Sequence, residues 1–186
     1  MTFRMRAAAV VVGCGLLLTG CVPPADVIVP VEAVDAQPVF ASDEEALAAA
    51  VEVYEEYLAA IQQRSNSGVE DLSVLSEFVT EEQLARERAA VQDSLRNGTI
   101  TKGEVTFERV AVQQRWVRDR GVESLITYLC LDVSNVVVLN SEGVDVTPLD
   151  RPNRVALEVE FLISGASPVE IKIARSEVWP DQSYCE

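Results

Sequence analysis

The 186-residue chain contains no histidine. Histidine is the commonest general acid–base residue and the commonest imidazole ligand of metals, so its absence excludes Ser-His-Asp and Cys-His nucleophilic sites. The chain also lacks the CxxC, GxxxxGK(S/T) and GxGxxG motifs and an EF-hand loop. We therefore expect no metal site, no bound cofactor and no enzyme activity of these common kinds.

Basic residues are also scarce, because 15 Lys and Arg stand against 30 Asp and Glu, a net charge of −15. An acidic surface repels the phosphate backbone of nucleic acids, which excludes nucleic acid as an expected partner. It also repels anionic lipid headgroups, so attachment to a membrane through a basic face is excluded as well.

Long hydrophobic runs are missing too. The apolar run Ala7–Leu18 is shorter than the roughly 20 residues that a membrane-spanning helix needs. It follows Arg4 and Arg6 and precedes the small residues Thr19 and Gly20. This order of charge, apolar core and small residues is typical of a secretory signal peptide, which we predict over residues 1–20.

The end of this segment, Leu18-Thr19-Gly20-Cys21, resembles the lipobox of bacterial lipoproteins. The resemblance implies that Cys21 receives a diacylglyceryl group, becomes the first residue after cleavage and holds the chain at the outer side of the cell membrane. Two acyl chains anchor a protein stably, whereas one binds only marginally. The alternative is an ordinary secretory signal with a cysteine near its cleavage site. Proline-rich residues 21–42 are then expected to form the lipidated tether.

Four cysteines leave one pair for the mature domain. Cys14 would be removed with the signal peptide and Cys21 would carry the lipid. Cys130 and Cys185 would then face an oxidising compartment, where disulfides persist. We predict a Cys130–Cys185 disulfide, with two separate buried thiols as the alternative.

From Ser42 onward, apolar residues recur at helical spacing. Ser42 with Glu45 forms a capping box and predicts a helix over residues 43–64, and Thr80 with Gln83 predicts another helix in the same way. The apolar stripe expected on the first helix consists of Leu47, Val51, Tyr54, Leu58 and Ile61.

After residue 103 the apolar pattern changes to the alternation of β-strands. Its parity slips between Phe107 and Val110, which predicts a β-bulge near Glu108 and Arg109. Residues 125–131 are apolar at both parities, as expected for a central strand and equally for an interface with a second copy. Further strands are expected over residues 155–163 and 169–173.

Two or three helices followed by five or so antiparallel strands predict an α+β domain over residues 43–186. Long strands with a bulge imply a strongly curved sheet, and we expect the N-terminal helices to pack on its concave side.

The layout of this domain resembles the NTF2-like lipoproteins of actinobacteria. The residues that carry the resemblance are the helix with Tyr54 and Tyr57, the long bent strands, Cys130-Leu131-Asp132 and the late Trp179 before Cys185. The resemblance implies an NTF2-like cone, a fold used by isomerases and cyclases and also by non-catalytic binding or dimerisation modules.

Two kinds of site residue follow from this expectation. Asp132 shares strand parity with Tyr128, so it is a candidate general base, with a plain strand-end carboxylate as the alternative. Tyr54, Tyr57, Trp116 and Tyr128 are candidates to line a pocket with Asp132, with core packing as the alternative.

The sequence as a whole predicts an extracytoplasmic lipoprotein, anchored by lipid on Cys21. We expect its domain to bind a small molecule or a protein partner without catalysis, and a homodimer is a further expectation. The alternative is a cone enzyme of isomerase, cyclase or hydratase type that uses Asp132 as its base.

Overall fold

The computed structural model describes residues 37–67, 71–165 and 167–186. The predicted signal peptide, Cys14, Cys21 and most of the predicted tether lie outside these ranges. The described elements are α1 (Asp43–Ser67), η1 (Ser73–Glu77), α2 (Glu81–Arg96), β1 (Thr99–Val117), η2 (Asp119–Gly121), β2 (Glu123–Asn140), β3 (Arg154–Ser164), β4 (Glu170–Val178) and η3 (Gln182–Cys185). The strands form one antiparallel sheet in the order β1-β2-β3-β4, so the α+β class is confirmed.

Both predicted helix starts are confirmed. The Ser42 hydroxyl accepts the backbone N–H of Glu45 at 3.2 Å, and the Glu45 carboxylate accepts the N–H of Ala41 at 3.1 Å. The Thr80 hydroxyl likewise accepts the N–H of Gln83 at 3.3 Å. Each contact satisfies a backbone donor that the first helical turn leaves without a partner.

The buried face of α1 differs from the predicted stripe. The fully buried residues are Ala46, Ala50, Tyr54 and Tyr57, whereas Leu47, Val51, Leu58 and Ile61 are only half-buried. The small alanines let the helix lie close to the sheet, and the Tyr57 hydroxyl finds a hydrogen-bond partner in Glu87 at 2.7 Å. The rotation of α1 about its axis therefore follows from its close packing on the sheet and from the hydrogen bond of Tyr57. The apolar pattern alone does not predict this rotation.

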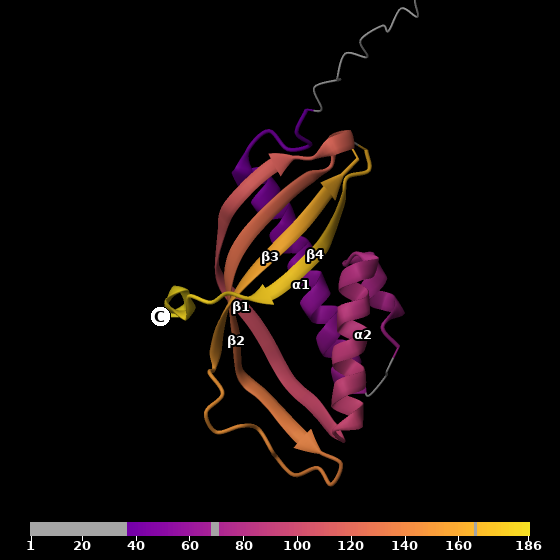
Figure 1. Cartoon of the computed structure of the whole chain (residues 1–186), viewed down its shortest axis with the longest axis vertical. Helices are drawn as coiled ribbons and strands as arrows, with labels where there is room; N and C mark the ends of the chain where they lie inside the picture. Colours follow the sequence, from indigo (N-terminus) through magenta and orange to yellow (C-terminus); the bar gives the residue numbers. More distant parts are fainter. Residues whose placement is uncertain (1–36, 68–70, 166) are drawn as a thin grey trace, which may run out of the picture. The chain divides into compact units, whose positions relative to one another are not determined.

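The sheet has four strands in the described residues rather than five or so, because β1 and β2 are very long. β2 pairs with β3 only from Glu123 to Asp132, and among the strands its remainder pairs with β1, with one further bridge from Leu139 to Asp145 in the loop that follows. Figure 1 shows β1 and β2 continuing below the ends of β3 and β4, with α1 behind the sheet and α2 beside its lower part. β2 has a strand on each side along its first half, which confirms the predicted central strand.

The predicted β-bulge is also confirmed. The register of β1 shifts between Glu108 and Ala111, and Arg109 has a φ of 53°. A second tight point lies at Gly103, whose φ is 116°. A Cβ there would come within 2.0 Å of the Asn135 carbonyl oxygen, so only glycine fits.

The main core lies between the helices and one face of the sheet. Its buried members from the sheet are Leu125, Leu129, Leu157, Val159, Phe161, Ile163 and Ile173. They meet α1, η1 and α2 through Tyr54, Tyr57, Leu75 and Leu84. Because side chains alternate along a strand, the residues of opposite parity lie on the other face of the sheet.

A buried ion pair fixes the end of the predicted tether to the sheet. Glu123 is fully buried and accepts Arg115 Nε at 2.8 Å and the backbone N–H of Val39. Arg115 also contacts the Phe40 carbonyl at 2.5 Å and Asp43 at 3.0 Å. Residues 39 and 40, inside the predicted tether, thus contact the sheet of the folded domain.

The sheet is not closed, since β1 and β4 are its two edges within the described ranges. The outer edge of β4 is partly covered, because the Ile173 N–H donates to the Phe78 carbonyl at 2.8 Å and the Ile173 carbonyl accepts from Thr80 at 3.0 Å. Among the described residues, none of the helices has the length and apolar character needed to span a membrane.

Candidate functional site

Two of the predicted pocket residues, Tyr54 and Tyr57, are core residues. They are 2% and 4% exposed, and the Tyr54 ring packs edge-on against Phe107 at 5.0 Å and against Phe161 at 6.3 Å. Burial raises the pKa of both phenols well above the ordinary value. The two hydroxyls therefore stay protonated at neutral pH, and that of Tyr57 donates a hydrogen bond to Glu87.

The other three, Trp116, Tyr128 and Asp132, lie on the opposite face of the sheet. Trp116 pairs with Ser124 in the register and packs beneath the Arg118 guanidinium at 5.5 Å. The Tyr128 ring packs in a tilted arrangement against Trp179, with the ring centroids 4.6 Å apart. The expectation that all five residues line one pocket is therefore wrong, because the sheet separates the two tyrosines of α1 from the rest.

Asp132 ends the part of β2 that pairs with β3, and inside this strand its side chain makes a local hydrogen bond of the Asx-turn type. Its carboxylate accepts the Ser134 backbone N–H at 2.8 Å, and hydrogen bonds from the Ser134 side chain and backbone lower the pKa of Asp132. The same Asp-x-Ser/Thr arrangement, with a lowered pKa of the aspartate, recurs at Asp71, Asp145 and Asp181. Asp132 thus has the geometry of a turn-forming aspartate and is a weaker base than an ordinary carboxylate.

The sheet face opposite the helices carries the C-terminal segment, residues 179–186, which a disulfide holds there. Cys130 and Cys185 are bonded, with their Cα atoms 5.4 Å apart, which confirms the predicted pair. The Tyr184 hydroxyl donates to the carbonyl of Arg109, and Arg109 Nη1 donates to the Tyr184 carbonyl at 3.2 Å. The segment therefore covers the bulge of β1, a contact that no local pattern in the sequence indicates.

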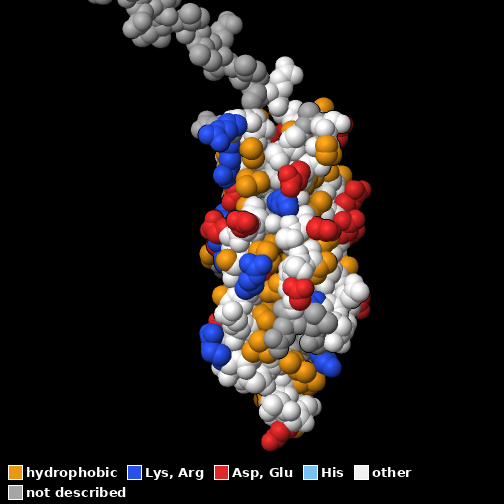
Figure 2. Space-filling model, turned by 90° about the vertical axis from the view of Figure 1, so that its right-hand side faces the viewer, with side chains coloured by type: hydrophobic (Ala, Val, Ile, Leu, Met, Phe, Trp, Pro, Cys, Tyr) orange, Lys and Arg blue, Asp and Glu red, His pale blue; other side chains and the backbone are white. Residues whose placement is uncertain are grey.

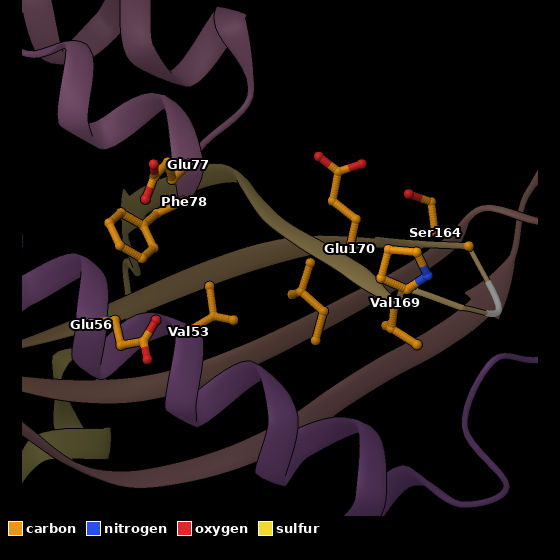
Figure 3. A pocket seen from close by; sticks show the side chains of 10 residues that line it. Val53, Glu56, Glu77, Phe78, Ser164, Val169 and Glu170 are labelled. Carbon is orange, nitrogen blue, oxygen red and sulfur yellow. The ribbon is translucent and has the colours of Figure 1, made fainter.

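A hollow of about 520 Å³ lies between α1, η1 and the β3–β4 hairpin. Figure 3 shows Glu56, Glu77 and Phe78 at one end of it and Ser164 and Val169 at the other. Its apolar lining comes from Val53, Phe78, Pro168, Val169 and Ile171, and its acidic lining from Glu56, Glu77 and Glu170.

The charged groups of this hollow are separated carboxylates, with a lysine beside one of them. Lys172 lies 3.3 Å from Glu170 and donates to the Ser76 carbonyl at 2.7 Å, so it holds the β4 side of the hollow to η1. No group of three or more His, Cys, Asp or Glu in the described ranges is arranged to hold a metal ion. Apolar surface with separated carboxylates is the kind of lining that receives a ligand carrying apolar and cationic parts.

A polar network that sequence reasoning missed links α1 with α2. The Glu87 carboxylate oxygen Oε1 accepts the Tyr57 hydroxyl at 2.7 Å and Gln83 Nε2 at 2.8 Å. Tyr57 and Gln83 are 4% and 3% exposed. The four-residue spacing of Gln83 and Glu87 on one helix was visible in the sequence, but the contribution of Tyr57 depends on how the two helices pack.

A scan against protein-family models finds no match, and a search of curated proteins finds none either. Among solved structures, the chain is similar to the intermembrane space region of the chloroplast protein ARC6, with 12% identity and a TM-score of 0.48. The match covers 71% of this chain and 95% of that one. It is also similar to a periplasmic fragment of TraM, with 9% identity and a TM-score of 0.43, covering 75% of this chain and 98% of that one.

Proposed function

We propose that the protein is a lipid-anchored lipoprotein of the cell envelope whose NTF2-like domain binds a small molecule or a protein partner without catalysing a reaction. The observation that carries the binding role is the hollow between α1, η1 and the β3–β4 hairpin (Figure 3). Its volume lies within the usual range of small-molecule sites, roughly 300–1,000 Å³.

The extracytoplasmic location is supported by the Cys130–Cys185 disulfide. Structural disulfides persist in oxidising compartments and are rare in the cytosol. The lipobox-like sequence ending at Cys21 supports the anchor, and residues 21–36 supply length for a tether between the lipid and the folded domain.

The NTF2-like assignment rests on layout, since two helices cover one face of a bent antiparallel sheet. The non-catalytic role is supported by the environment of Asp132. Its lowered pKa and its turn geometry make it a poor general base, which weighs against the alternative of a cone enzyme that uses this residue.

Mass spectrometry of the protein purified from its own membranes without reductant tests the anchor. We expect a polypeptide that begins at Cys21 and carries diacylglycerol, and a chain without lipid that begins elsewhere would contradict this part of the proposal. A native spectrum of the same sample also gives the number of chains per particle, which tests the predicted homodimer.

The binding role is tested with a variant that fills the hollow. Val169 is 40% exposed at its edge, so Val169→Trp adds bulk there without disturbing the core. Val144→Trp, at a 54% exposed position outside the hollow, is the matched control. We expect a non-covalent adduct on the wild type and the control and its loss from Val169→Trp. An adduct retained by Val169→Trp would contradict binding at this site.

A further inference from the structure

A second depression, here called the α1–α2 groove, lies between the end of α1, α2 and the start of β1. Its volume is about 340 Å³. The lining residues that matter below are Ile61, Arg64, Glu87, Val91, Leu95 and Ile100. Leu95 and Ile100 are each 46% exposed, which is high for large apolar side chains. Figure 2 shows hydrophobic side chains gathered in the lower half of the face where Figure 1 places α2.

The groove contains one carboxylate, Glu87, that two buried donors hold in place. Tyr57 and Gln83 both donate to Oε1 of this carboxylate. Burial, followed by the nearby charge of Glu87, raises the pKa of the Tyr57 phenol, so the hydroxyl remains a donor at neutral pH. A carboxylate fixed by two such donors loses little conformational entropy when it binds a ligand.

The other oxygen of Glu87, Oε2, accepts no hydrogen bond or ion pair from the residues that the structure describes. Two cations flank Glu87 on the same helix, Arg86 and Arg88, and Arg86 is engaged elsewhere. It donates to Gln83 Oε1 at 2.9 Å, to Glu82 at 2.8 Å and to the Ala174 carbonyl at 2.7 Å. Glu87 therefore presents an oriented negative charge beside the apolar side chains of the groove, which Arg64 also lines.

We propose that the α1–α2 groove binds a small organic amine with an apolar chain. Its ammonium group contacts Oε2 of Glu87, and its chain lies along Ile61, Val91 and Leu95. Charge-assisted hydrogen bonds to a fixed carboxylate are the strong polar contacts of small-molecule sites. The negative charge of the whole protein raises the local concentration of cations and disfavours fatty acids of the same shape.

Hexylamine is a suitable probe, and hexanoate is its anionic counterpart of equal chain length. Methyl NMR of the full chain follows Ile61, Val91 and Leu95 directly during titration. We expect saturable shifts of these methyl groups with hexylamine and none with hexanoate. Equal binding of hexanoate, or no saturable shift with hexylamine, would overturn the proposal.

Three variants separate the contribution of the charge from that of the fold. Glu87→Gln keeps an acceptor for Tyr57 and removes the charge, so the dissociation constant of hexylamine should rise about tenfold or more. Tyr57→Phe keeps the charge and removes one orienting donor, so we expect a smaller, severalfold rise. Glu52→Gln, on the exposed side of α1, is the charge-matched control and should leave the constant unchanged. Unchanged affinity in Glu87→Gln would refute the role of its carboxylate.

The source of the amine is distinguished by a further titration with a short peptide that has one lysine between leucines. Hexylamine binding at least as tight as that of the peptide supports a small-molecule ligand, and clearly tighter peptide binding would overturn it in favour of a protein partner. This site is separate from the hollow of Figure 3. Val169→Trp should therefore leave hexylamine binding intact, so each proposal can fail alone.

Discussion

Removing the Cys130–Cys185 disulfide should strongly destabilise the domain without changing the course of the sheet. The two cysteines are separated by 55 positions in the sequence. Loop-closure entropy for a loop of this length amounts to about 4 kcal/mol at 25 °C. We expect the Cys130→Ser/Cys185→Ser double variant to lose roughly this much free energy of unfolding.

The assay is urea unfolding. The double variant and the oxidised wild type are measured without reductant, and the wild type unfolded in the presence of reductant is the matched control. The reduced wild type and the double variant should unfold at the same urea concentration, well below that of the oxidised protein. The C-terminal segment should loosen first in both, because it would then be held by non-covalent contacts alone, among them the Tyr184–Arg109 hydrogen bonds and the ring contacts with Tyr128. A loss of less than about 1 kcal/mol would refute the reasoning, because the segment would then be held without its covalent link.

Two further predictions concern charged groups. Glu123→Gln should lower the free energy of unfolding by about 2–3 kcal/mol, because among the described residues it leaves the buried Arg115 with only the exposed carboxylate of Asp43 as an anionic partner. A loss below 1 kcal/mol in urea unfolding would contradict this. Hydrogen bonding lowers the pKa of Asp132 in the folded state, so its contribution to stability is present above about pH 4 and lost as the pH falls through the folded value. The free energy of unfolding, measured from pH 7 to pH 2, should therefore fall less steeply with acid in Asp132→Asn than in the wild type. A pKa of Asp132 above its ordinary value, measured by NMR, would contradict the assignment.

Features that depend on neighbours in the sequence could be predicted well. The helix starts at Ser42 and Thr80, the bulge at Arg109 and the central position of β2 all follow from local chemistry or from the parity of apolar residues. A capping side chain reaches a backbone N–H only three residues away, so the signal is short-range. The strand count was overestimated because a bulge and a strand end produce the same break in alternation.

The candidate site could not be predicted in the same way. Tyr54 and Trp116 were expected to share a pocket with Asp132, yet the sheet separates Tyr54 from the other two. An aromatic residue has the same sequence signature whether it fills a core or lines a cavity. No feature of the sequence around Glu87 indicates that its carboxylate is held in place, because this depends on a tyrosine 30 positions earlier on another helix.

The sequence by itself determined the acidic character of the chain, the exclusion of histidine chemistry and the α+β class, and it predicted the pairing of Cys130 with Cys185 through the resemblance of its N-terminus to bacterial lipoproteins. These properties are compositional or local, or follow from elimination among few residues. Only the tertiary structure decided which face of α1 is buried, where the C-terminal segment lies and which carboxylate stands oriented beside an apolar groove. The reason is physical: helix rotation and side-chain partners are set by packing across elements, where contacts between distant residues outweigh local preference.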